Sequence, residues 1–153
     1  MSGRLQDKVA IITGASGGIG KAFALRFAQE GAKLLLTTTS PDRAEATLKE
    51  VKAAGAEASF IKADISKEPD CQGIADEARK QYGKVDILVN NAAIWAGLNI
   101  TPWDAWKLED WDRIYDVNIK GTWMVCRVIA PLMIKQGKGK IINILCRKAG
   151  KAE

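Results

Sequence analysis

No histidine occurs in the 153 residues of this chain. The absence excludes catalytic triads that use imidazole as the base and zinc sites that use imidazole ligands. Cysteine is scarce as well, because Cys71, Cys126 and Cys146 have spacings typical of neither a disulfide framework nor a metal site. An odd, sparse set of cysteines is typical of reduced thiols inside the cell. We therefore expect no metal ion and a cytoplasmic location.

Long apolar runs are also lacking. The polar stretch Met1–Lys8 leads straight into a predicted strand, so no signal peptide is expected, and no apolar run approaches the length that crosses a membrane. The net charge of +5 comes from 23 basic and 18 acidic residues, mostly interspersed. Basic residues gather towards the C-terminus, which fits either a solvated helix end and tail or an anion-binding surface. Neither a membrane nor a nucleic acid is an expected partner.

What the sequence does contain is a regular alternation of short apolar runs and longer amphipathic stretches. The apolar runs predict strands at Val9–Thr13, Lys33–Thr38, Ala58–Ala63, Val85–Asn90 and Lys140–Leu145. The amphipathic stretches predict helices at Gly18–Glu30, Pro41–Ala54, Pro69–Tyr82 and Lys107–Gln136. Strands that are apolar on both faces and separated by helices indicate a parallel sheet covered on both sides. The predicted fold class is α/β, a Rossmann-like doubly wound sheet in three layers with strand order 3-2-1-4-5.

The chain is expected to form one dinucleotide-binding domain over residues 1–146. A basic tail follows at 147–153, with the composition of a disordered end. The fifth strand would be an exposed edge, with apolar side chains at Ile141, Ile142, Ile144 and Leu145. We expect a homo-oligomer that covers this surface, through the fifth strand or through the long helix around Asn118.

The strongest chemical signal is a glycine-rich turn, Thr13–Gly20, between the first strand and the first helix. Gly14 permits a tight turn, Gly18 lets the backbone approach a pyrophosphate, and Gly20 lets the helix pack close to the sheet. The N–H groups and positive dipole end of the new helix would then face the phosphates. The strand–turn–helix context makes this motif far more specific than glycines alone.

Together with three further landmarks, the turn resembles the short-chain dehydrogenase/reductase family. The family's Thr-Gly-x-x-x-Gly-x-Gly motif matches Thr13–Gly20, and Asn90-Asn91-Ala92-Ala93 resembles its Asn-Asn-Ala-Gly element. Asp64 matches an Asp that contacts adenine, and Asn118 matches the Asn of its catalytic tetrad. The landmarks run from Lys8 to about Cys146, essentially the whole chain.

The resemblance implies a nicotinamide dinucleotide site at the ends of the first four strands. Asp64 would meet the adenine amino group with Ile65 stacking nearby; a cap for the following turn is the alternative role for Asp64. Ile19 and Asn91 would flank the nucleotide. The implied cofactor-binding residues are Gly14, Ser16, Gly17, Gly18, Ile19, Gly20, Thr38, Thr39, Ser40, Arg43, Asp64, Ile65, Asn91, Ala92 and Ala93.

The end of the second strand bears on which cofactor is bound. Family members that prefer NAD carry an acid there for the ribose 2′-hydroxyl, whereas this chain has Leu36-Thr37-Thr38-Thr39-Ser40. Hydroxyl groups can donate to a 2′-phosphate, and Arg43 is within plausible reach. We therefore predict a preference for NADP(H), with NAD(H) as the alternative.

The family's chemistry rests on Asn, Ser, Tyr and Lys, the last two spaced Tyr-x-x-x-Lys. Asn118 matches the Asn, and Cys146 stands at the Ser position, where a small buried hydrophobe is the plainer interpretation. Tyr82 and Tyr115 are the two tyrosines of the chain, and neither has Lys four residues later. The family's Tyr and Lys, and its later strands and helices, would follow the fifth strand beyond this chain.

Three interpretations of function remain open at this point. The chain can be an oxidoreductase of the NAD(P)-dependent kind, expected to be weak or inactive alone because positioned acid–base catalysis is worth about 10²–10⁴-fold. It can be a non-catalytic nucleotide-binding or interaction protein. It can also be a truncation product of an active carbonyl reductase or alcohol dehydrogenase. All three share a cofactor site.

Overall fold

The computed structural model of the chain describes residues 3–94 and 102–145. Its strands are β1 (Val9–Thr13), β2 (Lys33–Thr38), β3 (Ala58–Lys62), β4 (Ile87–Asn90) and β5 (Lys140–Asn143). Its helical elements are α1 (Gly18–Gln29), α2 (Pro41–Ala53), α3 (Glu68–Tyr82), η1 (Trp103–Ala105), α4 (Leu108–Ile114), η2 (Tyr115–Gly121) and α5 (Thr122–Lys135). The predicted elements agree with these to within two residues, except in the long fourth helix.

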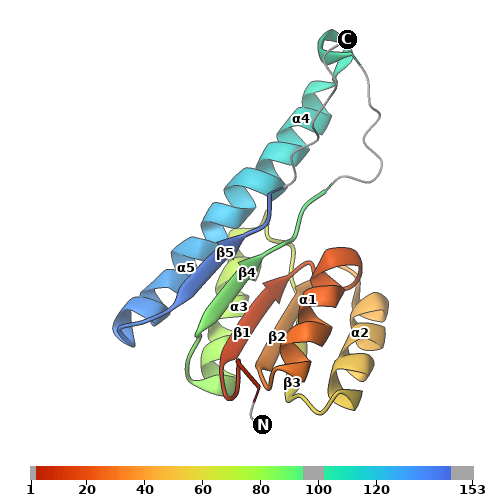
Figure 1. The fold of residues 1–153 in the computed structure, drawn as a ribbon. Coiled ribbons are helices and arrows are strands. Elements are labelled where there is room, and N and C mark those ends of the chain that lie inside the picture. The colour runs from red at the N-terminus through yellow and green to blue at the C-terminus, as the bar shows by residue number, and fades with distance from the viewer. Residues whose placement is uncertain (1–2, 95–101, 146–153) are drawn as a thin grey trace.

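The five strands form one parallel sheet in the order β3-β2-β1-β4-β5, which confirms the predicted topology. Every residue of β1 is buried, so the strand needs cover on both faces. Helices α1 and α2 cover one face, and α3 and α5 cover the other (Figure 1). The direction of winding reverses between β1 and β4, which is where open α/β sheets bind their ligands.

The core has two parts, one on each side of the sheet. Alternate residues of β1 and β2 divide between them, so that Ile11 and Leu35 face α3 and α5 while Ile12 and Leu36 face α1 and α2. Alanines such as Ala24 on α1 bring the helix close to the strands. This packing fixes the carboxyl ends of the strands relative to one another.

The long helix differs from the prediction of one regular α-helix. Between α4 and α5 the seven residues of η2 form a π-helix, a rare conformation that often occurs at functional sites. Gly121 is the last residue of η2 and lies against the loop that follows β3. A Cβ added to Gly121 would lie 2.9 Å from Cγ1 of Ile65 in that loop. The α4 end of the helix projects beyond the sheet (Figure 1).

The continuous helical stretch Leu108–Lys135 is 28 residues long and apolar enough to cross a membrane by length and composition alone. The sequence pattern predicted no apolar run of this length. Core helices of soluble proteins pass the same test, and α5 buries Met124, Val125 and Ile129 against the sheet and α3. The finding is therefore weak as an indication of a membrane span.

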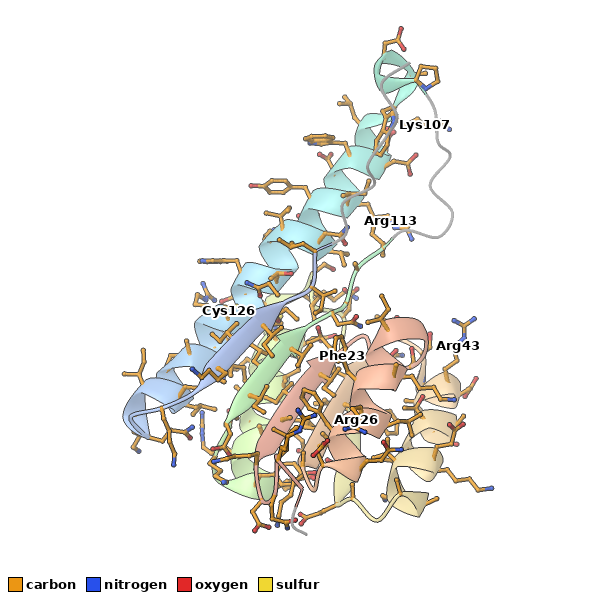
Figure 2. All side chains as sticks on the ribbon, viewed as in Figure 1. Phe23, Arg26, Arg43, Lys107, Arg113 and Cys126 are labelled. Carbon is orange, nitrogen blue, oxygen red and sulfur yellow. The ribbon has the colours of Figure 1, made fainter. Side chains whose placement is uncertain are left out.

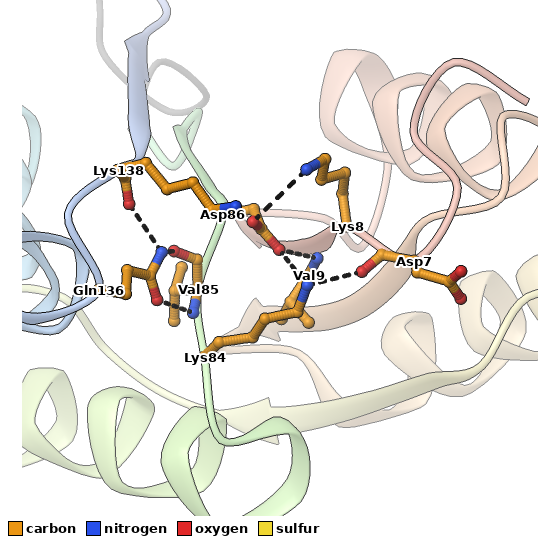
Figure 3. A network of polar contacts seen from close by, with 8 residues as sticks. All are labelled: Asp7, Lys8, Val9, Lys84, Val85, Asp86, Gln136 and Lys138. Atoms are coloured by element: carbon orange, nitrogen blue, oxygen red, sulfur yellow. Dashed lines mark hydrogen bonds and ion pairs between the residues drawn. The ribbon is translucent and has the colours of Figure 1, made fainter.

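The amino ends of the strands are held together by the carboxylate of Asp86 (Figure 3). Its Oδ2 accepts hydrogen bonds of 2.9 Å from the N–H of Val9 and from Nζ of Lys84, and Nζ of Lys8 lies 3.9 Å from Oδ1. Burial by itself would raise the pKa of Asp86, but these hydrogen bonds and charges outweigh it and lower the pKa below its ordinary value. The carboxylate therefore stays ionised and joins β1 to the segment before β4.

Strand β5 is exposed along its whole length, as the sequence predicted for an edge. Ile141 and Ile142 are both 41% exposed, and Leu145 beyond the strand is more exposed still. The predicted site residue Cys146 and the predicted tail 147–153 lie outside the described residues. Nothing in the fold bears on those two predictions.

Candidate functional site

The glycine-rich turn lies at the carboxyl end of β1 and begins α1. Gly14 has a φ of +66°, and an added Cβ would lie 2.7 Å from Cα of Ala92. At Gly20 an added Cβ would lie 2.3 Å from the carbonyl oxygen of Gly14, so the turn and the helix touch. These two glycines are required by the protein's own packing.

Gly17 and Gly18 differ, because an added Cβ at either position would meet no atom of the described chain within 4 Å. Gly18 has a φ of +51°, whereas Gly17 is fully extended and any residue could adopt its backbone. The open space stands directly at the N-terminus of α1, where the first N–H groups of a helix have no intrahelical partner. Ile19 is 62% exposed beside it. An anionic group can approach the backbone closely at this point.

The turn is clamped to β4 by Thr13 and Asn91. Oγ1 of Thr13 accepts hydrogen bonds of 3.0 Å from the N–H groups of Asn91 and Ala92. Nδ2 of Asn91 donates to the carbonyl oxygens of Thr13 (3.0 Å) and Gly14 (3.2 Å). The amide of Asn91 therefore holds the shape of the turn, and Ala93 follows it at the exposed surface.

A cluster of hydroxyl groups occupies the carboxyl end of β2. Oγ1 of Thr38 donates to Oγ of Ser16 (2.8 Å) and accepts from the N–H of Ser40 (3.1 Å). Thr39 is exposed next to them, and Arg43 extends from the first turns of α2 into the open (Figure 2). The cluster thus joins the end of β2 directly to the glycine-rich turn.

Asp64 and Ile65 occupy the loop after β3. Oδ1 of Asp64 accepts hydrogen bonds from both the N–H (3.0 Å) and the hydroxyl (2.7 Å) of Ser66, so Asp64 does cap the following turn. Its side chain nevertheless remains one-third exposed, with Oδ2 3.9 Å from Nζ of Lys67. Ile65 is buried in the core beside Gly121, which leaves its side chain little surface for stacking.

Asn118 lies within the π-helix and uses its side chain to hold the chain beyond β4. Oδ1 accepts a hydrogen bond of 2.9 Å from the N–H of Ile94, and Nδ2 donates to the carbonyl oxygen of the same residue at 3.4 Å. The hydroxyl of Thr122 donates to the carbonyl oxygen of Asn118. Asn118 is therefore a structural anchor in this conformation, at the same edge of the sheet as the glycine-rich turn.

A family model described as short chain dehydrogenase matches residues 8–152 of the chain. The chain belongs to this family. Its Rossmann fold and the glycine-rich turn are accordingly those of the short-chain dehydrogenases. The predicted family membership is confirmed.

Two curated relatives indicate the range of the similarity. A 3-oxoacyl-(acyl-carrier-protein) reductase of Thermotoga maritima is 36% identical over 141 residues, covering 92% of this chain and 56% of the relative. Glucose 1-dehydrogenase 2 of Bacillus subtilis is 39% identical over 142 residues, covering 92% of this chain and 54% of the relative. The chain spans about half the length of the curated relatives it matches.

Solved structures of dehydrogenases with bound cofactor have the same fold. An NAD⁺-bound xylitol dehydrogenase superimposes with a TM-score of 0.87 at 31% identity, covering 92% of this chain and 53% of the other. A metagenomic short-chain oxidoreductase in complex with NADP gives a TM-score of 0.86 at 37% identity, covering 97% of this chain and 66% of the other. Similar structures thus hold either nicotinamide dinucleotide.

Two groups that could move a proton, the hydroxyl of Tyr82 and the thiol of Cys71, are held within the fold. The hydroxyl of Tyr82 is bonded to Ser59 and to the carbonyl oxygen of Leu34, at the amino end of β2, and burial raises its pKa. Burial also raises the pKa of the Cys71 thiol to about 11 and keeps it protonated. The site as described can bind and orient a ligand, but these two groups cannot serve it as acid or base.

Sequence reasoning missed three features of the site and its support. The Thr38–Ser16 hydrogen bond and the π-helix depend on tertiary packing and leave no local pattern. The third feature, Asp86, did carry a signal, since it is an acid inside the apolar run Val85–Asn90. Within the described residues no group of three or more acidic or cysteine side chains is arranged to hold a metal.

Proposed function

We propose that the chain binds a nicotinamide dinucleotide at the carboxyl edge of its sheet, as the cofactor-binding part of a short-chain dehydrogenase. The observation that carries the proposal is the contrast between the glycines of the turn. Packing within the protein accounts for Gly14 and Gly20, whereas a side chain at Gly17 or Gly18 would enter open space at the start of α1. The positive φ of Gly18 by itself favours glycine, whereas the extended backbone of Gly17 does not require it, and a ligand lying against the open space explains why glycine occurs at position 17.

Each part of the dinucleotide has matching residues. The pyrophosphate would accept from N–H groups at the start of α1, beside Gly18 and Ile19. Oδ2 of Asp64, which lies 3.9 Å from Nζ of Lys67, would accept from the adenine amino group. Asn91, Ala92 and Ala93 would form the wall on the β4 side. The bound cofactor supplies hydride transfer, and these residues orient it.

A preference for NADP(H) over NAD(H) follows from the polarity of the β2 end. Ser16, Thr39 and Ser40 offer hydroxyl groups there, and Arg43 offers a positive charge that is free to turn towards the site. The nearest carboxylate along the chain is Asp42, in the first turn of α2. A 2′-phosphate would gain charge-assisted hydrogen bonds from this cluster.

Catalysis by the chain alone is expected to be weak. Reduction of a carbonyl needs a proton donor at the developing alkoxide. Neither Tyr82 nor Tyr115 is followed by Lys four residues later, as the family's motif requires. The side chain of Asn118 is already hydrogen-bonded to the backbone of Ile94. We therefore infer that cofactor binding exceeds turnover, whether the chain acts as a binding protein or together with residues supplied by another polypeptide.

The test is a fluorescence titration with NADPH and NADH, using two matched glycine variants. Gly18→Ala and Gly83→Ala both place a Cβ at positive φ, +51° and +69°, with no atom within 4 Å. Both should lose about 1 kcal/mol of stability for the backbone strain. Only Gly18→Ala should weaken cofactor binding, by about 100-fold or more. Equal binding by the two variants, or none by the unmodified chain, would overturn the proposal.

Self-association through the long helix is the second part of the proposal. Trp111, Tyr115, Ile119 and Trp123 follow one another four residues apart and are 52–59% exposed. Residues 108–116 carry four acids and one base, whereas residues 117–135 carry three bases and no acid. Two copies packed antiparallel would cover the apolar residues and bring opposite charges together.

Light scattering at micromolar concentrations tests this interface. Trp111→Glu should give a monomer, whereas Ile142→Glu on β5 should leave the oligomer intact. Dissociation by Ile142→Glu alone would place the interface on β5 instead. A monodisperse monomer before any substitution would rule out both surfaces.

A further inference from the structure

A groove lies at the start of β4 and β5, on the face of the sheet that carries α1. Helices α1 and α2 pack mainly on β1, β2 and β3, so this face of β5 is left open in the described part of the chain (Figure 1). The groove has a volume of about 320 Å³ and is lined by the first residues of β4 and β5, Ile87 and Lys140. It is therefore at the opposite end of the strands from the glycine-rich turn and the proposed dinucleotide site.

The floor of the groove is apolar. Four hydrophobic side chains line it: Leu5, Phe27, Ile87 and Ile142. Ile142 pairs with Val89 of β4, whose side chain packs in the core on the α1 side, so Ile142 points to the same face. Because Ile142 is 41% exposed, a ligand on the floor would remove apolar surface from water.

Charged side chains form the rim of the groove, which has three bases, Arg4, Arg26 and Lys140, and one acid, Glu30. Glu30 accepts hydrogen bonds from the backbone N–H of Arg4 (2.9 Å) and from its guanidinium (3.0 Å), and also from the guanidinium of Arg26. Each guanidinium has five N–H donors, so donors remain available on both. The rim therefore has a net positive charge, and Glu30 holds two of its cationic groups in place.

The N-terminal segment closes one side of the groove. The N–H of Leu5 donates to the carbonyl oxygen of Glu30 at 2.9 Å, and the N–H of Asp7 donates to that of Gly31 at 3.1 Å. Small-molecule sites in proteins measure about 300–1,000 Å³, which puts this groove at the lower limit. An α-helix with its side chains is about 10 Å or more across. The walled groove is therefore better suited to a small ligand than to a helix of another protein.

We propose that this groove binds a medium-chain carboxylate, whose alkyl chain covers Phe27 and Ile142 and whose anionic end meets Arg26 and Lys140. The alkyl chain gains from leaving water, and the carboxylate gains charge-assisted hydrogen bonds from the rim. The apolar floor alone would accept any apolar molecule, and the bases of the rim select an anion. Such a ligand would bind at the same time as a dinucleotide, because the two sites lie at opposite ends of the strands.

Calorimetric titration of the chain with hexanoate, octanoate and decanoate tests the proposal. We expect one saturable site per chain and an affinity that increases about 10-fold for each two carbons added, until the alkyl chain outgrows the floor. The neutral alcohol 1-decanol has the same chain length and should bind at least about fivefold more weakly than decanoate. Saturating NADPH should leave the decanoate constant within about twofold. No saturable binding of decanoate, equal binding of 1-decanol, or competition by NADPH would overturn the proposal.

Two pairs of matched variants locate the binding site. Ile142→Glu places a carboxylate on the floor and should weaken decanoate binding about 30-fold or more, whereas Ile141→Glu should leave it within about twofold. Ile141 is also 41% exposed, but it pairs with Leu88, which packs in the core on the other face. Arg26→Gln should weaken binding about 5- to 10-fold and Arg79→Gln should not, although the two arginines are similarly exposed, at 60% and 58%. Thermal unfolding of each variant checks the fold, and the exposed arginine pair tests the groove without changing β5.

Other results would assign the groove differently. Equal weakening by Ile142→Glu and Ile141→Glu, with no effect of Arg26→Gln, would place decanoate elsewhere and overturn the proposal. If Ile142→Glu dissociated an oligomer seen by light scattering, a second copy of the chain would occupy the groove in place of a carboxylate, and the proposal would be wrong.

Discussion

The two edges of the sheet use polar groups in opposite ways. At the amino edge Asp86 has partners at both of its oxygens, and the side-chain amide of Gln136 bonds to the backbone of Val85 and Lys138 (Figure 3). At the carboxyl edge Gly18 faces open space, and the partly exposed hydroxyl of Ser16 accepts one hydrogen bond, from Thr38. Polar groups whose hydrogen bonds are all made within the protein stabilise the fold. Polar groups that are held in place but lack a protein partner can bind a ligand. The amino edge therefore contributes to the stability of the fold, and the carboxyl edge keeps groups that a ligand can reach.

The largest expected effect on stability comes from Asp86→Ala at the amino edge. The change leaves the N–H of Val9 without its acceptor in a buried position, and removes the acceptor of Lys84. We expect a loss of about 2–3 kcal/mol in urea unfolding, with cofactor affinity unchanged in the folded protein. Asp76→Ala, an exposed acid on α3, serves as the control and should cost under about 0.5 kcal/mol. A comparable loss in both variants would remove the special role of Asp86.

Asn91→Ala should lower both the stability of the fold and the affinity for cofactor, because the side-chain amide of Asn91 holds the glycine-rich turn in shape. Loss of the bonds to Thr13 and Gly14 is expected to cost about 1–2 kcal/mol in unfolding and to raise the cofactor dissociation constant about 10-fold. Gln72→Ala on the surface of α3 is the matched amide control. An Asn91→Ala protein with undiminished affinity would show that the turn keeps its shape without the clamp.

Acid should weaken the amino edge selectively. The pKa of Asp86 is lower in the folded protein than its ordinary value near 3.8, so its stabilising contribution is complete above that value and is lost as the pH falls through the lower, folded pKa. Unfolding free energies measured from pH 5 downwards should therefore fall more steeply for the unmodified chain than for Asp86→Asn. The difference in slope is bounded by one proton, about 1.4 kcal/mol per pH unit. Parallel curves would contradict the assigned pKa direction.

The smallest effect is expected from Lys8→Met. Its ammonium lies 3.9 Å from Asp86 and is 43% exposed, so the loss should stay within about 0.5 kcal/mol and shrink in high salt. Lys84→Met should cost more, since Lys84 donates to both Asp86 and the carbonyl oxygen of Asp7 at 2.9 Å. If Lys8→Met lowered the unfolding free energy more than Lys84→Met, charge rather than hydrogen bonding would be the main contribution of these lysines to the stability of the amino edge.

Much of the fold could be predicted because local patterns repeat the global arrangement. Buried strands such as Val9–Thr13 and helix stops such as Gly31 each fix one element, and right-handed crossovers then leave few topologies. The long helix was predicted as regular because nothing local marks a π-helix. Its residues meet distant parts of the chain, since Gly121 lies against Ile65 and Asn118 is bonded to Ile94.

The sequence by itself determined the parallel sheet, its strand order and the place of the glycine-rich turn, because apolar periodicity and glycine positions act over a few residues. Only the tertiary structure decided which polar groups of the site remain free. Ser16 and Thr38 are 22 residues apart and meet because β1 and β2 pair in register. A hydrogen bond of that kind depends on the positions of atoms from two elements, and it sets which groups a ligand can reach.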